Sequence, residues 1–174
     1  MNRASIVVMG VAGCGKSSLG RSLADELGLA LVEGDEHHSA ASRAKMQRGM
    51  ALTDADREGW LAQLAALLRD HPEGLVMTCS ALRRVYREQL RAAAPGLCFV
   101  FLDVSHATAL ARVSQRPGHF FSASLVDSQF ATLEDPRSEA GVLRLDAALP
   151  LAELVMQARS WLSSAPAAAA VQRS

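Results

Sequence analysis

A glycine-rich segment near the N-terminus constrains the possible folds of this chain more than any other feature. It reads GVAGCGKS over residues 10–17, which satisfies the pattern GxxxxGK(S/T), and it directly follows an apolar run at Ile6–Met9. Leu19, Leu23 and Leu27 then recur at four-residue spacing, which is typical of the buried face of a helix. A strand, a glycine-rich turn and a helix in this order predict a βα unit with a phosphate-binding loop at its turn.

The chemistry of this loop predicts a polyphosphate ligand. Backbone N–H groups of the turn and the free donors of the helix N-terminus point into one concavity, where the helix dipole also favours negative charge. In loops of this type the lysine, here Lys16, bridges the β- and γ-phosphates, and the hydroxyl of Ser17 is a ligand of Mg²⁺. The expected nucleotide-binding residues are Gly10, Gly13, Cys14, Gly15, Lys16, Ser17 and Ser18.

Composition indicates one globular domain. The chain has 174 residues, of which 49% are hydrophobic and 21% charged, and its 18 basic residues balance its 18 acidic ones. A chain of this length buries roughly 70% of its unfolded surface, so it needs neither disulfides nor a structural metal. Zero net charge gives no general attraction to nucleic acid or to an anionic membrane. We therefore expect neither as a partner.

The cysteines and the N-terminus predict a cytoplasmic protein. Cys14, Cys79 and Cys98 are an odd number without a CxxC pair, which fits reduced thiols. Residues 1–5 lack the apolar region and cleavage site of a signal peptide. Cys14 lies beside Lys16, a setting that suits a reactive thiol, but no resolving cysteine is near it in sequence. A small residue that fits the turn is favoured over a redox role.

Short apolar runs alternate with helical periodicity along the rest of the chain. The further predicted strands are Leu29–Val32, Leu75–Thr78, Leu97–Leu102 and Val142–Leu145. One further predicted helix begins after an N-cap at Thr53. Three others cover Ala81–Ala93, Ala107–Gln115 and Leu151–Trp161. This alternation predicts an α/β fold of three layers, in which a five-stranded parallel sheet is flanked by helices and binds ligands at the carboxyl ends of its strands.

Two segments depart from the alternation. Residues 116–136 carry Pro117, Gly118 and paired phenylalanines, and we expect an insert outside the sheet with the length of a mobile lid. Residues 163–174 are alanine-rich without apolar periodicity, and we expect a disordered tail. Residues 1–162 are then a single domain.

The ends of the later strands indicate the class of phosphate chemistry. Asp35 follows the second predicted strand, where a carboxylate can act as general base for an acceptor hydroxyl or hold the water shell of Mg²⁺. The chain has no guanine-reading pattern of the Asn/Thr-Lys-x-Asp type, and its third strand leads to Thr78-Cys79-Ser80 rather than to an aspartate. These features disfavour a GTPase.

A series of motifs carries a family resemblance. They are Gly34-Asp35-x-x-His38, Lys45-Met46-x-x-Gly49-x-x-Leu52-x-Asp54-x-Asp56-Arg57-x-x-Trp60-Leu61, Cys79-Ser80-Ala81-Leu82, Tyr86-Arg87, Gly118-His119-Phe120 and Ser128-Gln129-Phe130. In this order the chain resembles the P-loop gluconokinases. The resemblance implies a P-loop kinase fold like that of nucleoside monophosphate and shikimate kinases. It also implies Mg²⁺ and ATP as cofactors, transfer of the γ-phosphate to the 6-hydroxyl of D-gluconate, and a cytoplasmic homodimer.

The implied substrate has a carboxylate, a string of hydroxyls and a primary hydroxyl as nucleophile. Arg57 and Arg83 are candidates for the carboxylate, because guanidinium groups form bidentate bonds with it. His38 and Ser80 are candidate hydroxyl partners, and we expect Trp60, Leu61, Leu64, Met46, Phe99 and Phe101 to pack in the core.

The resemblance also assigns two arginines to the nucleotide side. It places Arg112 beside the adenine and Arg116 at the transferring phosphoryl group, where an arginine neutralises developing charge. With Lys16 and Asp35, Arg116 completes the expected catalytic set.

The chain departs from the family pattern on the acceptor side, at Ser39, Ser42, Ala51 and Gly59. Two alternatives therefore stay open. One is a kinase of the same fold that acts on shikimate or another aldonic acid, and the other is a nucleotide-binding regulatory protein without turnover.

Overall fold

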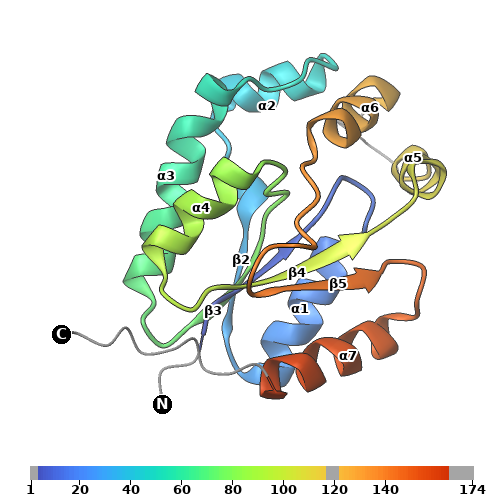
Figure 1. The fold of residues 1–174 in the computed structure, drawn as a ribbon. Coiled ribbons are helices and arrows are strands. Elements are labelled where there is room, and N and C mark those ends of the chain that lie inside the picture. Colours follow the sequence, from blue (N-terminus) through green and yellow to red (C-terminus); the bar gives the residue numbers. More distant parts are fainter. Residues whose placement is uncertain (1–3, 117–121, 165–174) are drawn as a thin grey trace.

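A computed structural model describes residues 4–116 and 122–164 and confirms the predicted α/β class. Its sheet has five parallel strands in the order β2-β3-β1-β4-β5 (Figure 1). Their bounds are Ile6–Met9 for β1, Ala30–Glu33 for β2, Leu75–Thr78 for β3, Cys98–Asp103 for β4 and Val142–Asp146 for β5. The first strand thus lies in the middle of the sheet, and β2 lies at one edge.

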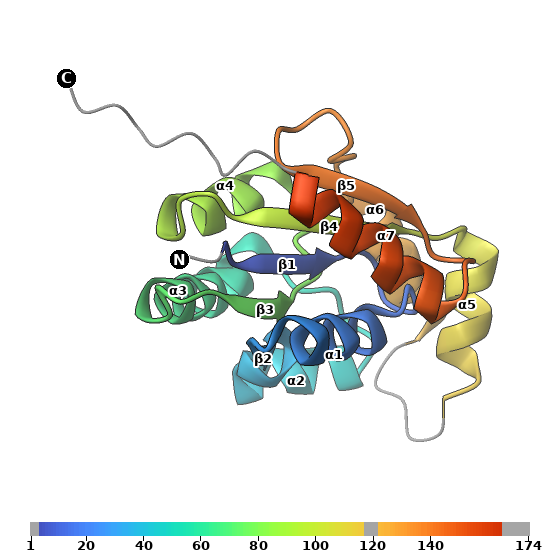
Figure 2. The same cartoon turned by 90° about the horizontal axis from the view of Figure 1, so that it is seen from below.

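Helices cover both faces of the sheet. One face carries α1 (Lys16–Leu27) and α7 (Leu151–Ser164), and the other carries α3 (Asp54–Asp70) and α4 (Arg84–Ala93) (Figures 1 and 2). None of the helices in the described part of the chain has both the length and the apolar character needed to cross a bilayer.

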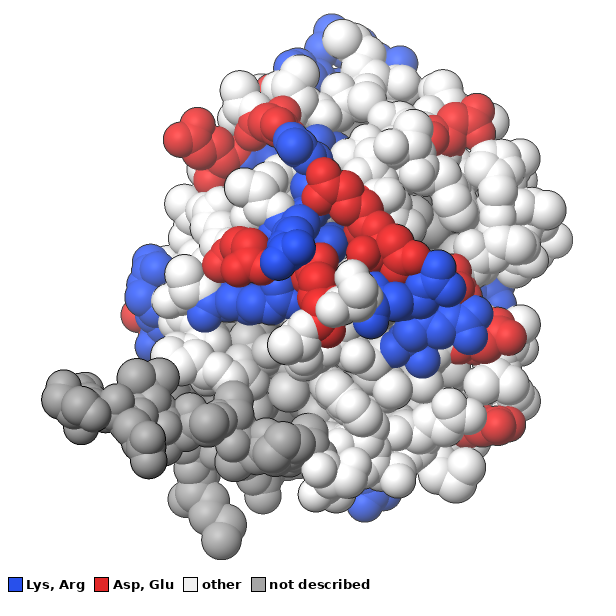
Figure 3. Space-filling view, viewed as in Figure 1, with Lys and Arg blue, Asp and Glu red and all other residues white. Residues whose placement is uncertain are grey.

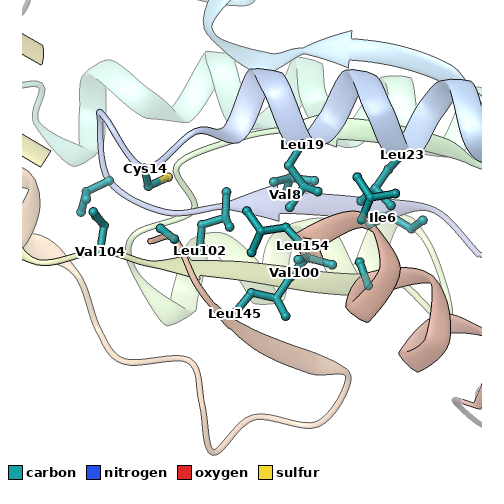
Figure 4. Packing of buried hydrophobic residues seen from close by; sticks show 14 of the residues in the cluster. Ile6, Val8, Cys14, Leu19, Leu23, Val100, Leu102, Val104, Leu145 and Leu154 are labelled. Carbon is teal, nitrogen blue, oxygen red and sulfur yellow. The ribbon is translucent and has the colours of Figure 1, made fainter. Parts of the chain in front are cut away.

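The hydrophobic core is divided by the sheet. Ile6 and Val8 of β1 pack with Leu19 and Leu23 of α1 and with Leu154 of α7 (Figure 4). The alternate residues of β1 point to the opposite face, where they meet the helix that carries Trp60 and Leu64. Because both faces of β1 are buried against helices, the strand is held in place, and so is the start of the loop that follows it.

The N-terminus of α3 confirms the predicted cap. The hydroxyl of Thr53 accepts a hydrogen bond from the backbone N–H of Asp56, and the Asp56 carboxylate accepts one from the backbone N–H of Thr53. This reciprocal pair satisfies two donors that the first turn of a helix leaves unpaired.

Three short elements were not predicted. They are the 3₁₀ helix η1 (Gly34–His37), α2 (Ala40–Gln47) and α6 (Ala123–Thr132). The first two occupy the polar stretch after β2. Ser39 caps α2 by accepting from the backbone N–H of Ser42, so the serine that departs from the family pattern supplies a helix cap.

Several predicted boundaries are corrected. Helix α4 begins at Arg84 rather than Ala81, because Ala81 has a φ of 46° and cannot belong to a right-handed helix. Helix α7 continues to Ser164, beyond the predicted start of the tail. Within the predicted insert, residues 123–132 form α6, while Gly118 and His119 lie outside the described residues. The predicted tail lies outside them from residue 165 onward.

Candidate active site

A cavity of about 420 Å³ lies at the carboxyl end of the sheet. The phosphate loop forms one wall, η1 and α2 form another, and residues of α3, α5 (His106–Ser114) and α6 complete it. The predicted site residues on this wall are Gly13, Gly15, Lys16, Ser17, Asp35, His38, Arg57, Ser80 and Arg116. Residues more than one hundred positions apart in the sequence therefore meet at one site.

The glycines of the phosphate loop are required by its backbone. Gly10, Gly13 and Gly15 have φ values of 145°, 81° and 99°, in the region that disfavours side chains. A Cβ atom on Gly13 would also lie 2.7 Å from the carbonyl oxygen of Ala109 on α5. The loop is therefore packed directly against α5.

Lys16 lies over the first half of the loop. Its Nζ donates to the carbonyl oxygens of Gly10 and Val11, at 3.0 and 3.2 Å. The thiol of Cys14 is buried beneath the loop, 4.0 Å from the same Nζ, as expected for a small residue that fits the turn. Ser18 is exposed and does not line the cavity.

Glu33 is a candidate site residue that sequence reasoning missed. Its Oε2 accepts hydrogen bonds from the hydroxyls of Ser17, at 3.0 Å, and Thr78, at 2.5 Å. The predicted strand ended at Val32, so the last residue of β2 was not considered as a ligand. A carboxylate at the carboxyl end of a strand beside the phosphate loop is the signal that could have identified it.

Asp35 extends from η1 toward the same cavity. Its side chain is 72% exposed, and its Oδ1 lies 3.7 Å from Nε2 of His38. Desolvation raises the pKa of Asp35, but the neighbouring His38 ring and the charge of Lys16 outweigh this effect. The pKa of Asp35 is therefore lowered, and its carboxylate is ionised at neutral pH.

His38 and Trp60 form the wall beside Asp35. Their rings stack at a centroid distance of 4.2 Å, and the indole Nε1 donates to the carbonyl oxygen of Gly34 at 2.7 Å. Trp60 is buried as predicted, but it also lines the cavity, and Met46 is half-buried on the cavity wall rather than in the core. Nδ1 of His38 is buried without a hydrogen-bond partner among the described residues. An unpaired buried nitrogen on a cavity wall indicates a position for a polar ligand atom.

The two arginines predicted to bind a carboxylate separate in the structure. Arg57 lines the cavity and donates to the hydroxyl of Tyr86 at 3.2 Å. Arg83 does not line it, because its guanidinium pairs with Asp54 at 2.5 Å and with Glu134 at 3.6 Å. The structure therefore places Arg83 outside the cavity.

The cavity wall also carries an arginine that was not predicted as a site residue. Arg43 of α2 lines the cavity and donates to the backbone carbonyls of Glu36, at 2.5 Å, and His38, at 3.3 Å. No helix was predicted over residues 40–47, so Arg43 was not considered as a site residue.

Arg112 holds the phosphate loop from behind. Its guanidinium donates to the carbonyl oxygens of Gly13 at 3.2 Å, Cys14 at 3.4 Å and Ala147 at 3.0 Å. It therefore joins the loop to the segment after β5. Contact with an adenine stays a prediction, whereas the support that Arg112 gives to the loop is a direct observation.

A buried ion pair supports the segment that carries Ser80. Arg87 is fully buried and donates to Glu139 at 2.5 Å and to the carbonyl oxygens of Ala81 at 2.7 Å and Leu82 at 3.1 Å. Desolvation raises the pKa of Glu139, but hydrogen bonds from Arg87 and Arg91 outweigh it and lower this pKa.

Basic and acidic side chains alternate in a band across the face of the molecule shown in Figure 3.

The fold and the site together define a P-loop kinase, in which a phosphate loop faces an ionised carboxylate and arginines across one cavity. A family model described as an AAA domain matches residues 6–137. A gluconokinase of Gluconobacter oxydans is 46% identical to the chain over 143 residues, which are 80% of each protein. The thermosensitive gluconokinase of Escherichia coli is 36% identical over 160 residues, which are 89% of this chain and 85% of that protein.

A solved structure gives the same result. The crystal structure of a gluconokinase from Sinorhizobium meliloti superposes with a TM-score of 0.86 at 46% identity, covering 93% of both chains. The chain belongs to the gluconokinase family.

Proposed function

We propose that this chain transfers the γ-phosphate of ATP to the 6-hydroxyl of D-gluconate, giving 6-phospho-D-gluconate and ADP. The observation that carries the proposal is the position of the Asp35 carboxylate, which shares a cavity with Lys16 and Ser17 of the phosphate loop. The remaining cavity wall offers the cations and polar groups that a sugar acid requires.

The residues beside the loop fit Mg²⁺. In the described parts of the chain, no three His, Cys, Asp or Glu side chains are grouped to hold a metal ion unaided. Mg²⁺ usually takes one or two protein oxygens and completes its octahedron with water and substrate phosphates. The Ser17 hydroxyl and the Glu33 carboxylate, 3.0 Å apart, would hold it, with Asp35 acting through water. When bound, Mg²⁺ neutralises negative charge on the phosphate oxygens.

The phosphoryl transfer uses charge and position. Asp35 orients the 6-hydroxyl and accepts its proton as the bond between that oxygen and the γ-phosphorus forms. The bond from the γ-phosphorus to the bridging oxygen breaks, and ADP leaves. Lys16 and Arg116 reduce the repulsion between the phosphate oxygens and the incoming hydroxyl.

The acceptor lies between η1, α2 and α3 in this proposal. Nδ1 of His38 and the hydroxyl of Ser80 are offered to substrate hydroxyls. Arg57 and Arg43 are the cations that face the cavity from α3 and α2, and we assign the carboxylate to Arg57. A guanidinium suits this role because it binds a carboxylate through two parallel hydrogen bonds.

We further propose that the enzyme is a cytoplasmic homodimer and that residues 116–136 act as a lid. Arg112 would then flank the adenine while it holds the loop. These proposals rest on the family resemblance, and the position of Arg116 on the cavity wall supports the lid.

The decisive experiment measures ADP formation by the purified chain with Mg·ATP. D-Gluconate, shikimate, other aldonic acids and a sample without acceptor are compared. We expect strong stimulation by D-gluconate alone. Stimulation by another acid would keep the mechanism and change the substrate, whereas tight ATP binding without stimulation by any acceptor would indicate a regulatory protein.

Substitution of Arg57 by alanine tests the carboxylate assignment. We expect the KM for D-gluconate to rise about tenfold or more, because a charge-assisted bidentate contact is lost. The KM for ATP and the kcat should change less than about threefold, since the phosphate loop is untouched. Steady-state kinetics with each substrate varied in turn give both values.

Arg83→Ala is the matched control for Arg57→Ala. Its guanidinium pairs with Asp54 outside the cavity, so the KM for D-gluconate should stay near that of the parent enzyme. An equal rise in both variants would contradict the assignment of Arg57.

A further inference from the structure

A contact between α6 and the phosphate loop has no role in the mechanism described so far. The Oε1 atom of Gln129 accepts a hydrogen bond of 2.7 Å from the backbone N–H of Ala12, which is 117 residues away in the sequence. Gln129 also lines the cavity with Lys16 and Arg116. A side chain from α6 therefore reaches the loop at the site of phosphate binding.

The contact fixes the orientation of the Gln129 amide. A backbone N–H can only donate, so the oxygen of the amide must face Ala12. The two N–H donors of Nε2 then point away from this bond, and Nε2 has no hydrogen-bond partner among the described residues. Gln129 consequently presents two unused neutral donors at the cavity.

The position of Ala12 indicates which phosphate these donors meet. Lys16 extends back over the loop, and its Nζ bonds to the carbonyls of Gly10 and Val11, directly before Ala12. The lysine of such a loop reaches the β- and γ-phosphates. Ala12, and with it the amide of Gln129, therefore lies at the γ-phosphate end of the loop.

Helix α6 contacts α5 beside the phosphate loop. Nε2 of His106 on α5 lies 2.5 Å from Oδ1 of Asp127, and the His106 ring contacts Phe130 at a centroid distance of 5.1 Å. Helix α5 is itself joined to the loop through Arg112. Donors that are fixed before the ligand arrives stabilise its charge at a lower cost in reorganisation.

We propose that Gln129 contacts the transferring phosphoryl group, with its amide oriented by Ala12 N–H and its Nε2 donating to a γ-phosphate oxygen of ATP. The inference rests on the proposed function only for the identity of ATP. It gives the chain a neutral donor beside the two cations, Lys16 and Arg116.

The test compares nucleotides with and without a γ-phosphate. Binding of Mg·ADP and of the non-hydrolysable Mg·AMPPNP to the full chain is measured by calorimetry for the parent, Gln129→Leu and Gln129→Glu. We expect Gln129→Leu to weaken AMPPNP binding about tenfold, since one hydrogen bond to a charged group is lost. ADP binding should change less than about twofold, since ADP lacks the group that Gln129 contacts.

Gln129→Glu keeps the shape of the side chain and an acceptor for Ala12 N–H, but it places a negative charge opposite the γ-phosphate. It should therefore weaken AMPPNP more than Gln129→Leu does. The control is Gln157→Leu, which removes a glutamine of α7 whose amide donates to Glu153. It should leave both affinities unchanged.

Equal weakening of ADP and AMPPNP would show a purely structural role and overturn the proposal, as would unchanged affinities in both Gln129 variants. The result is independent of the acceptor. Selective loss of AMPPNP binding in an enzyme that D-gluconate fails to stimulate would support Gln129 and reject the proposed function.

Discussion

Replacing Lys16 by alanine is expected to lower kcat/KM for ATP by about 10³-fold. Lys16 carries the charge of the phosphate loop, and its Nζ is held over that loop by the carbonyls of Gly10 and Val11. Removal of this charge leaves the negative oxygens of the transferring group without their fixed partner. The loss should lie mainly in kcat, because the charge that develops during transfer is affected more than ground-state binding.

The chain offers a matched control, since its second lysine is Lys45. Lys45 pairs with Asp56 at 2.8 Å and does not line the cavity. Lys45→Ala removes the same side chain and should cost less than about tenfold in kcat/KM, through the weakened N-terminus of α3. Comparable losses in the two variants would contradict a direct role for Lys16.

The second large effect is expected for Asp35→Asn, which should lower kcat by about 10²–10⁴-fold, the usual contribution of a general base. Asparagine keeps the size of the side chain but cannot accept the proton, and its uncharged amide attracts a metal-bound water less strongly. Nucleotide affinity should change less than about threefold, since the phosphate loop is intact. Single-turnover measurements at saturating D-gluconate separate the chemical step from product release.

The lowered pKa of Asp35 leads to a prediction about the pH dependence of activity. The neighbouring His38 ring and the charge of Lys16 outweigh desolvation and lower its pKa, so the carboxylate stays ionised to a lower pH than an ordinary aspartate. Protonation of Asp35 therefore reduces activity only below the titration range of an ordinary aspartate, and it should produce no acidic limb in the rate profile near neutral pH.

Glu36→Gln is the control for Asp35→Asn. Glu36 belongs to the same 3₁₀ helix and lines the same cavity, but it has no role in the proposed mechanism. Its substitution removes one negative charge from the site and should change kcat less than about tenfold. A kcat of Asp35→Asn within tenfold of the parent would remove the proposed base.

The sequence was sufficient to predict the sheet because strand formation here depends on local apolar runs. Strands β1 and β3 begin and end where predicted, β2 and β4 are each shifted by one residue, and β5 extends one residue further. Helices with a regular apolar stripe, such as α1, were found for the same reason. Helix α2 has one buried residue, Ser42, and helix α6 has two, Leu125 and Val126, so neither shows such a stripe.

The candidate site was predictable where the backbone pattern itself forms it. The phosphate loop is of this kind, because glycine positions and a lysine determine its shape. The arginines are different. Arg57 and Arg83 were both carboxylate candidates on sequence grounds, but in the structure Arg83 pairs with Asp54 and Glu134. Contacts between distant segments cannot be derived from local spacing.

The order of the strands divides the site into two modules. The phosphate loop follows β1, which is paired with strands on both sides, whereas Glu33 ends the edge strand β2 and Asp35 lies just after it. The helices that bear the proposed acceptor wall, α2 and the start of α3, lie above the end of β2 (Figure 1). All four departures from the family pattern, Ser39, Ser42, Ala51 and Gly59, fall in this outer module. Evolution can therefore alter acceptor recognition in such a scaffold while the centre of the sheet, and the nucleotide chemistry it supports, is inherited intact.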